Sequence, residues 1–508
     1  MSTPQTAATG DEGSSPAIRT VAGTGDPSFG GDGGPAASAQ LNNPSGVAVG
    51  HAGTLYLCDR TNHRVRKITT DGKISTVAGT GKPGPGGDGG PATAAQLNFP
   101  RGVTVDKTGA LYIADSDNHR VRKVTTDGKI STVAGTGTAG FSGDGGAATA
   151  ARLDKPFGVA VDGTGALYVA EYTNHRVRKV TTDGKISTVA GNGSAGFGGD
   201  GGPAVAAQLK NPYGVAVDGA GDLYIADSGN HRVRKITADG KISTIAGTAT
   251  KGSGGDNGPA TQAQLNNPLA VLADSTGTLY IAEHSGHRIR RITPDGMIST
   301  VAGTGVKGSD GDDGPAASAQ LNGPFGLAVD CVDALYIASW GGHRLRKIAS
   351  ARMAGLPDSG TVVSWASVRS RLRMGVLRES TKDGAEIHQT LASPRAHQRW
   401  RLVVAGQDKG DVLYTIENVR SGKVLEVVGA GTADGAVLAQ RAYEGGDAHH
   451  QQWRLVPVGS ATEIPRVYEI ANRHSGLLLR VDTNARTVIK QHVAEGDHRD
   501  RQWQLLPV

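Results

Sequence analysis

Residues 211–236 read NPYGVAVDGAGDLYIADSGNHRVRKI, and five further copies of this segment occur along the chain. Every copy contains a His-Arg pair, and the six histidines follow one another at a spacing of 56 residues: His63, His119, His175, His231, His287 and His343. Six units at one period, without slippage, indicate a repeat architecture, either a solenoid or a propeller.

Each unit contains four short segments that are rich in Val, Ile, Tyr and Thr and are separated by turns with Gly or Asp. In the second unit these are residues 100–106, 110–115, 119–125 and 129–135. Such segments predict β-strands joined by hairpins, and four antiparallel strands make one propeller blade. The rest of the unit is a long loop, in which GGPATAAQL (89–97) predicts a helix of about two turns.

The two ends of the repeat region predict ring closure. The sixth unit stops at residues 346–350 and lacks a fourth strand, whereas IRTVAG (18–23) matches ISTVAG and precedes the first complete unit. We therefore expect residues 18–23 to supply the outer strand of the sixth blade, which leaves no open edge in the ring. The predicted class is all-β, with a six-bladed β-propeller over residues 18–350 that an N-terminal strand closes.

Segments such as residues 211–236 resemble NHL repeats, and the long-loop variant TVAGTG…GDGGPA…AQLN…P resembles the NHL modules of large bacterial and teneurin-type proteins. The resemblance covers residues 18–350. It implies a six-bladed propeller that serves as a recognition platform for proteins, RNA or glycans. A few members, such as peptidylglycine amidating lyase, are enzymes.

The 56-residue period is lost after Ser350, and a different pattern follows. Tryptophans lie in QRWRLV (398–403), QQWRLVPV (451–458) and RQWQLLPV (501–508), within three weakly similar units of about 50 residues. These motifs resemble those of ricin B-type β-trefoil lectin domains, which implies a C-terminal β-trefoil over residues 361–508 with the tryptophans in a shared core. We expect residues 351–360 to be a linker and residues 1–17 to be disordered.

The trefoil resemblance also implies shallow sugar pockets, in which a carboxylate, an amide and an aromatic ring contact the ligand. No unit keeps the full set. The middle unit comes nearest, with Glu426, Gln440 and Tyr443, which we take as candidate carbohydrate-binding residues. A purely structural role for this domain stays open.

The blades differ sharply at two positions: the residue between Pro and Gly at the start of the first strand, and the turn after the second strand. Both lie on one face of a propeller, and large aromatic and Arg side chains in a chain with only 4% aromatics favour a binding surface. Drift of loop residues is the alternative. The predicted partner-binding residues are Arg60, Arg101, Phe157, Tyr172, Tyr213, His284, Phe325 and Trp340.

Three repeated or clustered features have competing interpretations. The six histidines suggest a metal site, but each opens a third strand away from the axis, which favours a turn or inter-blade hydrogen-bonding role. The repeated Arg64, Arg66 and Lys67 suggest a nucleic-acid-binding stripe, but they spread around the ring, and each Arg is expected to pair with an acid such as Asp59 or Asp115 or to lie over its neighbour. The loop with Asp310, Asp312 and Asp313 is a calcium candidate, whereas the single Asp of the other copies is expected to cap the helix.

Composition excludes several classes of protein. The net charge of +6 over 508 residues does not indicate dedicated nucleic-acid binding. Two cysteines exclude a disulfide scaffold, and there is no apolar span of about 18 residues. The N-terminus does not resemble a signal peptide, so a cytoplasmic location is the default. No nucleophile motif occurs.

We therefore expect a monomeric, non-catalytic recognition protein without a cofactor. Its propeller face would engage a protein, peptide or glycan, and its trefoil would bind carbohydrate. The alternative is an enzyme, a metal-assisted lyase or hydrolase, with its site at the mouth of the central channel.

Overall fold

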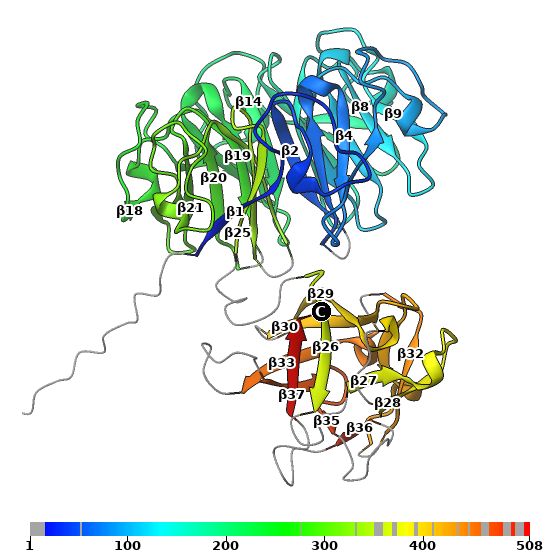
Figure 1. The fold of residues 1–508 in the computed structure, drawn as a ribbon. Helices are drawn as coiled ribbons and strands as arrows, with labels where there is room; N and C mark the ends of the chain where they lie inside the picture. Colours follow the sequence, from blue (N-terminus) through cyan, green and yellow to red (C-terminus); the bar gives the residue numbers. More distant parts are fainter. Residues whose placement is uncertain are drawn as a thin grey trace, which may run out of the picture.

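The computed structural model contains a propeller and, C-terminal to it, a second β domain (Figure 1). It describes residues 16–50, 53–274, 276–330, 333–349, 359–367, 373–390, 395–408, 411–433, 436–445, 448–458, 467–480, 489–492 and 502–507. The predicted disorder of the first residues and most of the predicted linker lie outside this part of the chain. No helix in the described residues is long and apolar enough to cross a membrane.

The propeller has six four-stranded antiparallel blades, as the repeat predicts. Blades one to three consist of β2 (Pro44–Val49), β3 (Leu55–Asp59), β4 (Arg64–Ile68) and β5 (Ile74–Ala78); β6 (Pro100–Val105), β7 (Leu111–Asp115), β8 (Arg120–Val124) and β9 (Ile130–Ala134); and β10 (Pro156–Val161), β11 (Leu167–Glu171), β12 (Arg176–Val180) and β13 (Ile186–Ala190).

Blades four to six continue the same order. They consist of β14 (Pro212–Val217), β15 (Leu223–Asp227), β16 (Arg232–Ile236) and β17 (Ile242–Ala246); β19 (Pro268–Ala273), β20 (Leu279–Glu283), β21 (Arg288–Ile292) and β22 (Met297–Ala302), with the short β18 (Gly258–Pro259) beside β22; and β23 (Pro324–Val329), β24 (Leu335–Ser339), β25 (Arg344–Ile348) and β1 (Ile18–Ala22).

The ring closes as predicted. Strand β1 pairs antiparallel with β25, in a register that sets Ile18 opposite Ile348 and Arg19 opposite Lys347. Ile18 is fully buried in a cluster that joins the fifth and sixth blades. The N-terminal strand therefore satisfies the outer edge of the last blade.

A buried arginine network holds each loop onto its blade. Arg66 of β4 donates to Asp59 at 3.0 Å and to Asp32 of the long loop at 2.7 Å, and its side chain is fully buried. Arg122 pairs in the same way with Asp115 and Asp88. The predicted pairing of these arginines with Asp59 and Asp115 is confirmed. Because both partners satisfy one buried charge, losing a single member of such a network typically costs about 3–5 kcal/mol.

The long loop differs from the prediction, because it holds a single 3₁₀ turn in place of a helix of two turns. Its backbone is used elsewhere: the Ala92 amide donates to the Gly128 carbonyl, and the Ala92 and Ala95 carbonyls accept from Gly79 and Thr80. The loop aspartate bonds the arginine and does not cap the turn, so that expectation is also wrong. The turns are η1 (Ala36–Ser38), η4 (Ala92–Ala94), η6 (Ala148–Ala150), η7 (Ala204–Ala206), η9 (Ala260–Gln262) and η10 (Ala316–Ser318).

The six repeated histidines connect neighbouring blades. Each adopts a left-handed backbone conformation, and its Nδ1 accepts a hydrogen bond from the amide just before the first proline of the next blade, as between His63 and Phe99 at 3.2 Å. Equivalent bonds of 3.1–3.2 Å occur in all six blades. Burial lowers the pKa of His63, which keeps Nδ1 available as an acceptor. The turn and inter-blade role predicted for these residues is confirmed.

Glycines let the first strands pack closely around the axis. A Cβ atom on Gly102 would lie 2.4 Å from the Phe157 carbonyl oxygen, and one on Gly158 would lie 2.4 Å from that of Tyr213. A Cβ atom at either position would clash with the next blade, which would have to move outward, whereas the fifth blade carries Ala270 at the equivalent place. This close approach draws the variable residues beside the glycines into one tight ring.

The C-terminal domain is a β-trefoil whose strands form one connected hydrogen-bonded network. The strands are β26 (Val362–Ser367), β27 (Arg373–Val376), β28 (Ala385–Thr390), β29 (Trp400–Asp408), β30 (Asp411–Asn418), β31 (Val424–Val427), β32 (Leu438–Arg441), β33 (Trp453–Val458), β34 (Val467–Asn472), β35 (Leu478–Arg480), β36 (Lys490–His492) and β37 (Gln502–Pro507). Short 3₁₀ turns lie among them, at η12 (Leu377–Glu379), η13 (Ala396–Gln398), η14 (Val428–Ala430) and η15 (His449–Gln451).

The three predicted tryptophans occupy the shared trefoil core. Trp400, Trp453 and Trp503 are fully buried, and each indole N–H donates to a backbone carbonyl of the same unit, at 3.1, 2.9 and 3.2 Å. The repeated bond satisfies the buried indole N–H at the equivalent position of each unit.

Candidate functional site

The eight predicted partner-binding residues, which we call the recognition cluster, lie at one end of the propeller. Arg101, Phe157, Tyr213 and Phe325 each follow the proline that begins a first strand, and the other four lie in the turn after a second strand. The hairpin register brings the two positions together, because Pro156 pairs with Glu171 and the next residues, Phe157 and Tyr172, then lie at the same end.

Aromatic contacts join most of the cluster around the axis. Ring centroids lie 4.7 Å apart between Phe157 and Tyr213, and 5.1 Å apart between Tyr213 and Phe325. His284 contacts Phe325 and Trp340 at 6.0 and 5.6 Å. Most of these pairs are tilted or edge-to-face, the arrangement that favours aromatic pairs. The structure therefore brings together residues that are up to 280 positions apart in the sequence, from Arg60 to Trp340.

Burial corrects one part of the predicted surface. Phe157, Tyr213 and Phe325 are only 5–8% exposed, because they face one another across the narrow mouth of the channel. They form an apolar plug and are not exposed contact residues. The accessible part of the cluster consists of the five half-buried side chains: Arg60, Arg101, Tyr172, His284 and Trp340.

Two arginines of the cluster have no carboxylate partner within ion-pair distance among the described residues. Arg101 lies over the Phe157 ring at 4.1 Å and donates to the Tyr213 hydroxyl at 3.2 Å. Arg60 lies over the Phe99 ring at 5.3 Å. Burial and the neighbouring positive charge of Arg101 lower the pKa of Arg60. Two cations therefore share a half-buried site.

Several buried polar atoms of the cluster have no hydrogen-bond partner among the described residues. They are Nε of Arg60, Nε of Arg101, Nδ1 of His284 and Nε1 of Trp340. Burial also lowers the pKa of His284, so its ring is neutral near pH 7. An unsatisfied buried donor costs about 1–3 kcal/mol, which a water molecule or ligand reached by a side-chain movement would relieve. Unsatisfied Nε atoms also occur on buried arginines elsewhere in the propeller, such as Arg66 and Arg178.

The channel below the cluster is narrow. A cavity of about 100 Å³ lies there, lined by Arg101, the buried rings and the glycine and aliphatic residues of the first strands. In the described part of the propeller, no three His, Cys, Asp or Glu side chains lie close enough to hold a metal ion. The alternative of a metal-assisted enzyme therefore has no ligand set among these residues.

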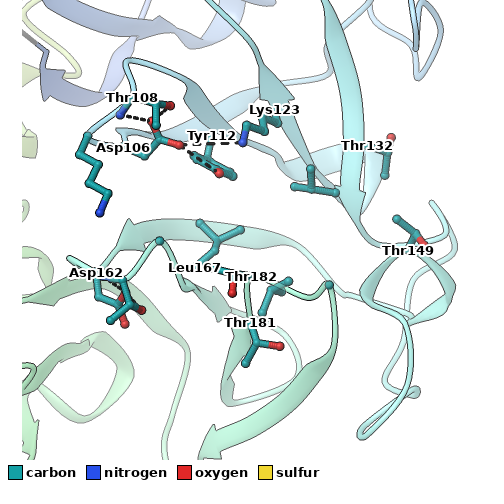
Figure 2. A pocket seen from close by; sticks show the side chains of 16 residues that line it. Asp106, Thr108, Tyr112, Lys123, Thr132, Thr149, Asp162, Leu167, Thr181 and Thr182 are labelled. Atoms are coloured by element: carbon teal, nitrogen blue, oxygen red, sulfur yellow. Dashed lines mark hydrogen bonds and ion pairs between the residues drawn. The ribbon is translucent and has the colours of Figure 1, made fainter.

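A larger pocket lies between the second and third blades (Figure 2). Its lining includes Asp106 and Asp162, in the turns after the first strands, which lie at the opposite end of the blades from the cluster. Its volume is about 500 Å³, and six threonines line it together with Asp106, Lys123 and Asp162. Asp106 already accepts from Thr108 at 2.6 Å and from the Tyr112 hydroxyl at 3.3 Å. Sequence analysis did not single out this pocket, since most of its residues belong to the shared repeat.

The trefoil candidates have different environments. Gln440 is fully buried; its amide donates to the Ser380 and Lys382 carbonyls at 2.9 and 3.0 Å, and its oxygen accepts from Ser421. Gln491 of the third unit makes an equivalent set of bonds. Gln440 thus has no free donor for a sugar, and its assignment as a carbohydrate contact is corrected to a structural role.

Glu426 belongs to a small polar group, and Tyr443 directly precedes another of its members, Glu444. Glu426 is 1% exposed and pairs with Arg441 at 2.7 Å, while Tyr443 is 44% exposed. Ligand atoms of Glu426, Glu444 and His450 lie within 4.8 Å of one another, the one such group found in the described residues. Arg441 already neutralises Glu426. Glu444 could not be found from the sequence, because a strand, a loop and a 3₁₀ turn supply the three residues and their spacing does not show this approach.

The calcium candidate is the loop that holds Asp310, Asp312 and Asp313. Asp312 pairs with Arg346 at 2.5 Å, and the loop aspartate of each of the other five blades makes the equivalent pair. Its carboxylate is therefore already neutralised, and Asp310 and Asp313 belong to no group of three ligands in the described residues.

Comparisons with known proteins match both domains. Residues 17–84, 80–142, 136–198 and 192–254 match a family model described as Teneurin NHL domain, and residues 354–441 and 396–492 match Ricin-type beta-trefoil lectin domain-like. Human Teneurin-4 is 34% identical over 248 residues, which cover 42% of this chain and 9% of that protein. Bovine NHL repeat-containing protein 2 is 26% identical over 60% of this chain and 46% of its own length.

A solved structure supports the same fold. A Bacteroides thetaiotaomicron protein of unknown function is 22% identical over 66% of this chain and 75% of its own, with a TM-score of 0.51. The chain spans about a tenth of the length of the teneurins that it matches.

The chain consists of a six-bladed propeller followed by a trefoil, and its similarity to NHL and ricin-type lectin domains supports a role in binding or recognition. More particularly, the chain is an NHL-repeat β-propeller that carries a ricin B-type lectin-like β-trefoil at its C-terminal end.

Proposed function

We propose that this chain binds a partner protein or peptide, without catalysing a reaction, through the accessible residues of the recognition cluster. The observation that carries the proposal is the group of half-buried cations and unsatisfied donors at the open end of the channel. Aromatic and Arg side chains dominate the energy of protein interfaces. A partner that covers the cluster would satisfy these donors and bury the outer sides of Tyr172 and Trp340.

The second domain leaves this end of the propeller open. Gln407 of the trefoil donates to Asp333, in the turn between β23 and β24, at 3.4 Å. That turn is at the opposite end of the blade from Trp340, since antiparallel strands place successive turns at alternate ends. A partner can therefore reach the cluster without displacing the trefoil.

Peptide display tests the proposal. A phage library of 12-residue peptides would be selected on the immobilised full chain, and each enriched clone would be measured against two variants. Trp340→Ala removes an accessible aromatic residue of the cluster, and Lys129→Ala changes an exposed residue at the opposite end. We expect at least a tenfold loss of affinity with Trp340→Ala and none with Lys129→Ala. Failure to enrich any clone, or equal binding to both variants, would refute the proposal.

For the trefoil we propose a sugar-binding role centred on Tyr443. Tyr443 is 44% exposed and directly precedes Glu444, whose carboxylate lies within 4.8 Å of that of Glu426, which supports an aromatic face near hydrogen-bond acceptors. A glycan array probed with the full chain tests this idea. Bound glycans should be lost with Tyr443→Ala and kept with Val428→Ala, which changes an equally exposed apolar residue. An array without signal would contradict it.

A further inference from the structure

We infer that the group recognised by the cluster is a carboxylate on an acidic peptide segment, held between Arg60 and Arg101. This inference rests on the proposed function, because it names the chemistry of the ligand that the same surface takes. It begins from a contrast between the arginines of the cluster and the other arginines of the propeller.

The second arginine of each third strand is neutralised within its own blade. Each of these six lies within 2.5–2.7 Å of a loop aspartate and is at most 1% exposed. The first arginine of each third strand is half-buried without an ion pair in the described residues, but most of them donate to backbone carbonyls, as Arg64 does to Thr80 at 2.7 Å. Arg60 and Arg101 are also half-buried and have no ion pair in this part of the chain. They differ in lying next to each other, with the Tyr213 hydroxyl as the acceptor recorded for the couple.

The electrostatics of the couple favour an added anion. Burial and, after it, the charge of Arg101 lower the pKa of Arg60, while Tyr213 and Asp117 oppose this effect. Burial lowers the pKa of His63, with smaller contributions in the same direction from Arg64 and Arg60, so that ring is neutral near pH 7. The site therefore holds two positive charges against one distant negative charge. A ligand carboxylate would relieve the repulsion and form charge-assisted hydrogen bonds.

The geometry suits a carboxylate. Arg101 is fixed by the Phe157 ring below it and by its bond to Tyr213, so little side-chain entropy remains to be lost on binding. A bidentate carboxylate takes Nε–H and one Nη–H of a guanidinium. The Nε atoms of both arginines lack a partner, and a small rotation of either guanidinium toward the ligand would satisfy them.

The packing of the rings favours a peptide over a sugar or a nucleic acid. Sugars and bases stack on open aromatic faces. Here Phe157, Tyr213 and Phe325 cover one another and are 5–8% exposed. A phosphate backbone would also need a longer basic track than two arginines. An acidic side chain flanked by apolar residues fits two cations beside the half-buried Tyr172 and Trp340.

The test uses the same peptide library with two matched double variants. Arg60→Gln with Arg101→Gln removes both cations of the cluster. Lys129→Gln with Lys185→Gln removes two exposed charges at the opposite end. We expect Asp or Glu to be enriched in clones selected on the wild type. We also expect their affinity to fall at least tenfold with the arginine variant and in 500 mM salt, and to be unchanged with the lysine variant.

The outcomes separate this inference from the proposed function. Some clones could lose binding to Trp340→Ala, yet show no enrichment of Asp or Glu and bind the arginine variant normally. This result would refute the inference that a carboxylate is recognised and leave the recognition role intact. Absence of any clone would refute both. A 12-nucleotide single-stranded RNA could bind the wild type more tightly than every clone and fail to bind the arginine variant. This result would overturn the inference that the ligand is a peptide and would indicate a nucleic acid. Arg60→Lys with Arg101→Lys, which keeps the charge, should restore part of the affinity if folding is unharmed.

Discussion

Replacing Ile18 with alanine tests whether the N-terminal strand closes the ring. Ile18 is 0% exposed and packs with Ile289, Leu327, Ile337 and Ile348 across the last two blades. Deleting the buried side-chain atoms of an isoleucine typically costs about 2–5 kcal/mol, from lost burial and from the cavity that remains. The loss should weaken the pairing of β1 with β25.

The repeat supplies a matched control. Ile186 occupies the equivalent position in β13 and is 1% exposed, so Ile186→Ala removes the same atoms from the same environment. Both variants should lower the free energy of unfolding by a similar amount. They differ in topology, because β13 follows β12 directly in the chain, whereas β1 is joined to β25 by hydrogen bonds and packing alone.

Hydrogen exchange of the full chain, followed by mass spectrometry, distinguishes the two variants. In Ile18→Ala, the amides of β25 should exchange at least about 30-fold faster than in the wild type. The reason is that the free energy that holds β1 against β25 falls by about 2 kcal/mol or more. In Ile186→Ala, the amides of β25 should be unaffected below the unfolding transition. Unchanged exchange of β25 in Ile18→Ala, with the expected loss in Ile186→Ala, would refute the closed ring.

Three further predictions concern the core of the propeller. Burial raises the pKa of the Cys58 thiol, so it should react with Ellman's reagent only on unfolding in urea; rapid reaction of the native chain would contradict its burial. Burial raises the pKa of Glu171 to about 7, above its unfolded value, so the free energy of unfolding should fall as pH rises from about 4.5 to 7. Between pH 5 and 8 the wild type should lose up to about 3 kcal/mol more than Glu171→Gln, and equal slopes in urea titrations would exclude this coupling. Gly191→Ala should lower the free energy of unfolding by several kcal/mol, since the new Cβ would lie 2.2 Å from the His175 carbonyl oxygen. Gly184→Ala, also at positive φ but in open space, should lower it by about 1 kcal/mol. Similar melting temperatures of the two variants would refute the argument.

Much of this protein could be predicted from its sequence because the architecture is repetitive. Four short strands and a fixed period leave few closed arrangements, and the surplus IRTVAG segment identified the closing strand. The role of His63 and its equivalents in contacts between blades could also be predicted, since a residue that recurs in every blade has the same structural role in each of them. The loop was misjudged, because Pro91 and the alanines after it favour a helix only while their backbone groups lack other partners.

The candidate site was predictable in position but not in character. The variation between blades identified the recognition cluster, and hairpin geometry set both variable positions at one end. The exposure of these residues could not be predicted from the sequence. Phe157 and Tyr213 are buried because glycines let neighbouring blades come into contact, and the distance between blades depends on the closed ring. Gln440 was misassigned for a similar reason, since its partners Ser380 and Lys382 are about 60 residues away.

Sequence alone thus determined the number of blades, the closing strand, the two domains and the residues in which the blades differ, because these follow from period and alternation. Tertiary structure alone decided which of those residues face solvent, which cations lack a partner and which polar side chains hold the core together. These properties depend on burial and on distances between segments far apart in the chain, and no local pattern encodes them.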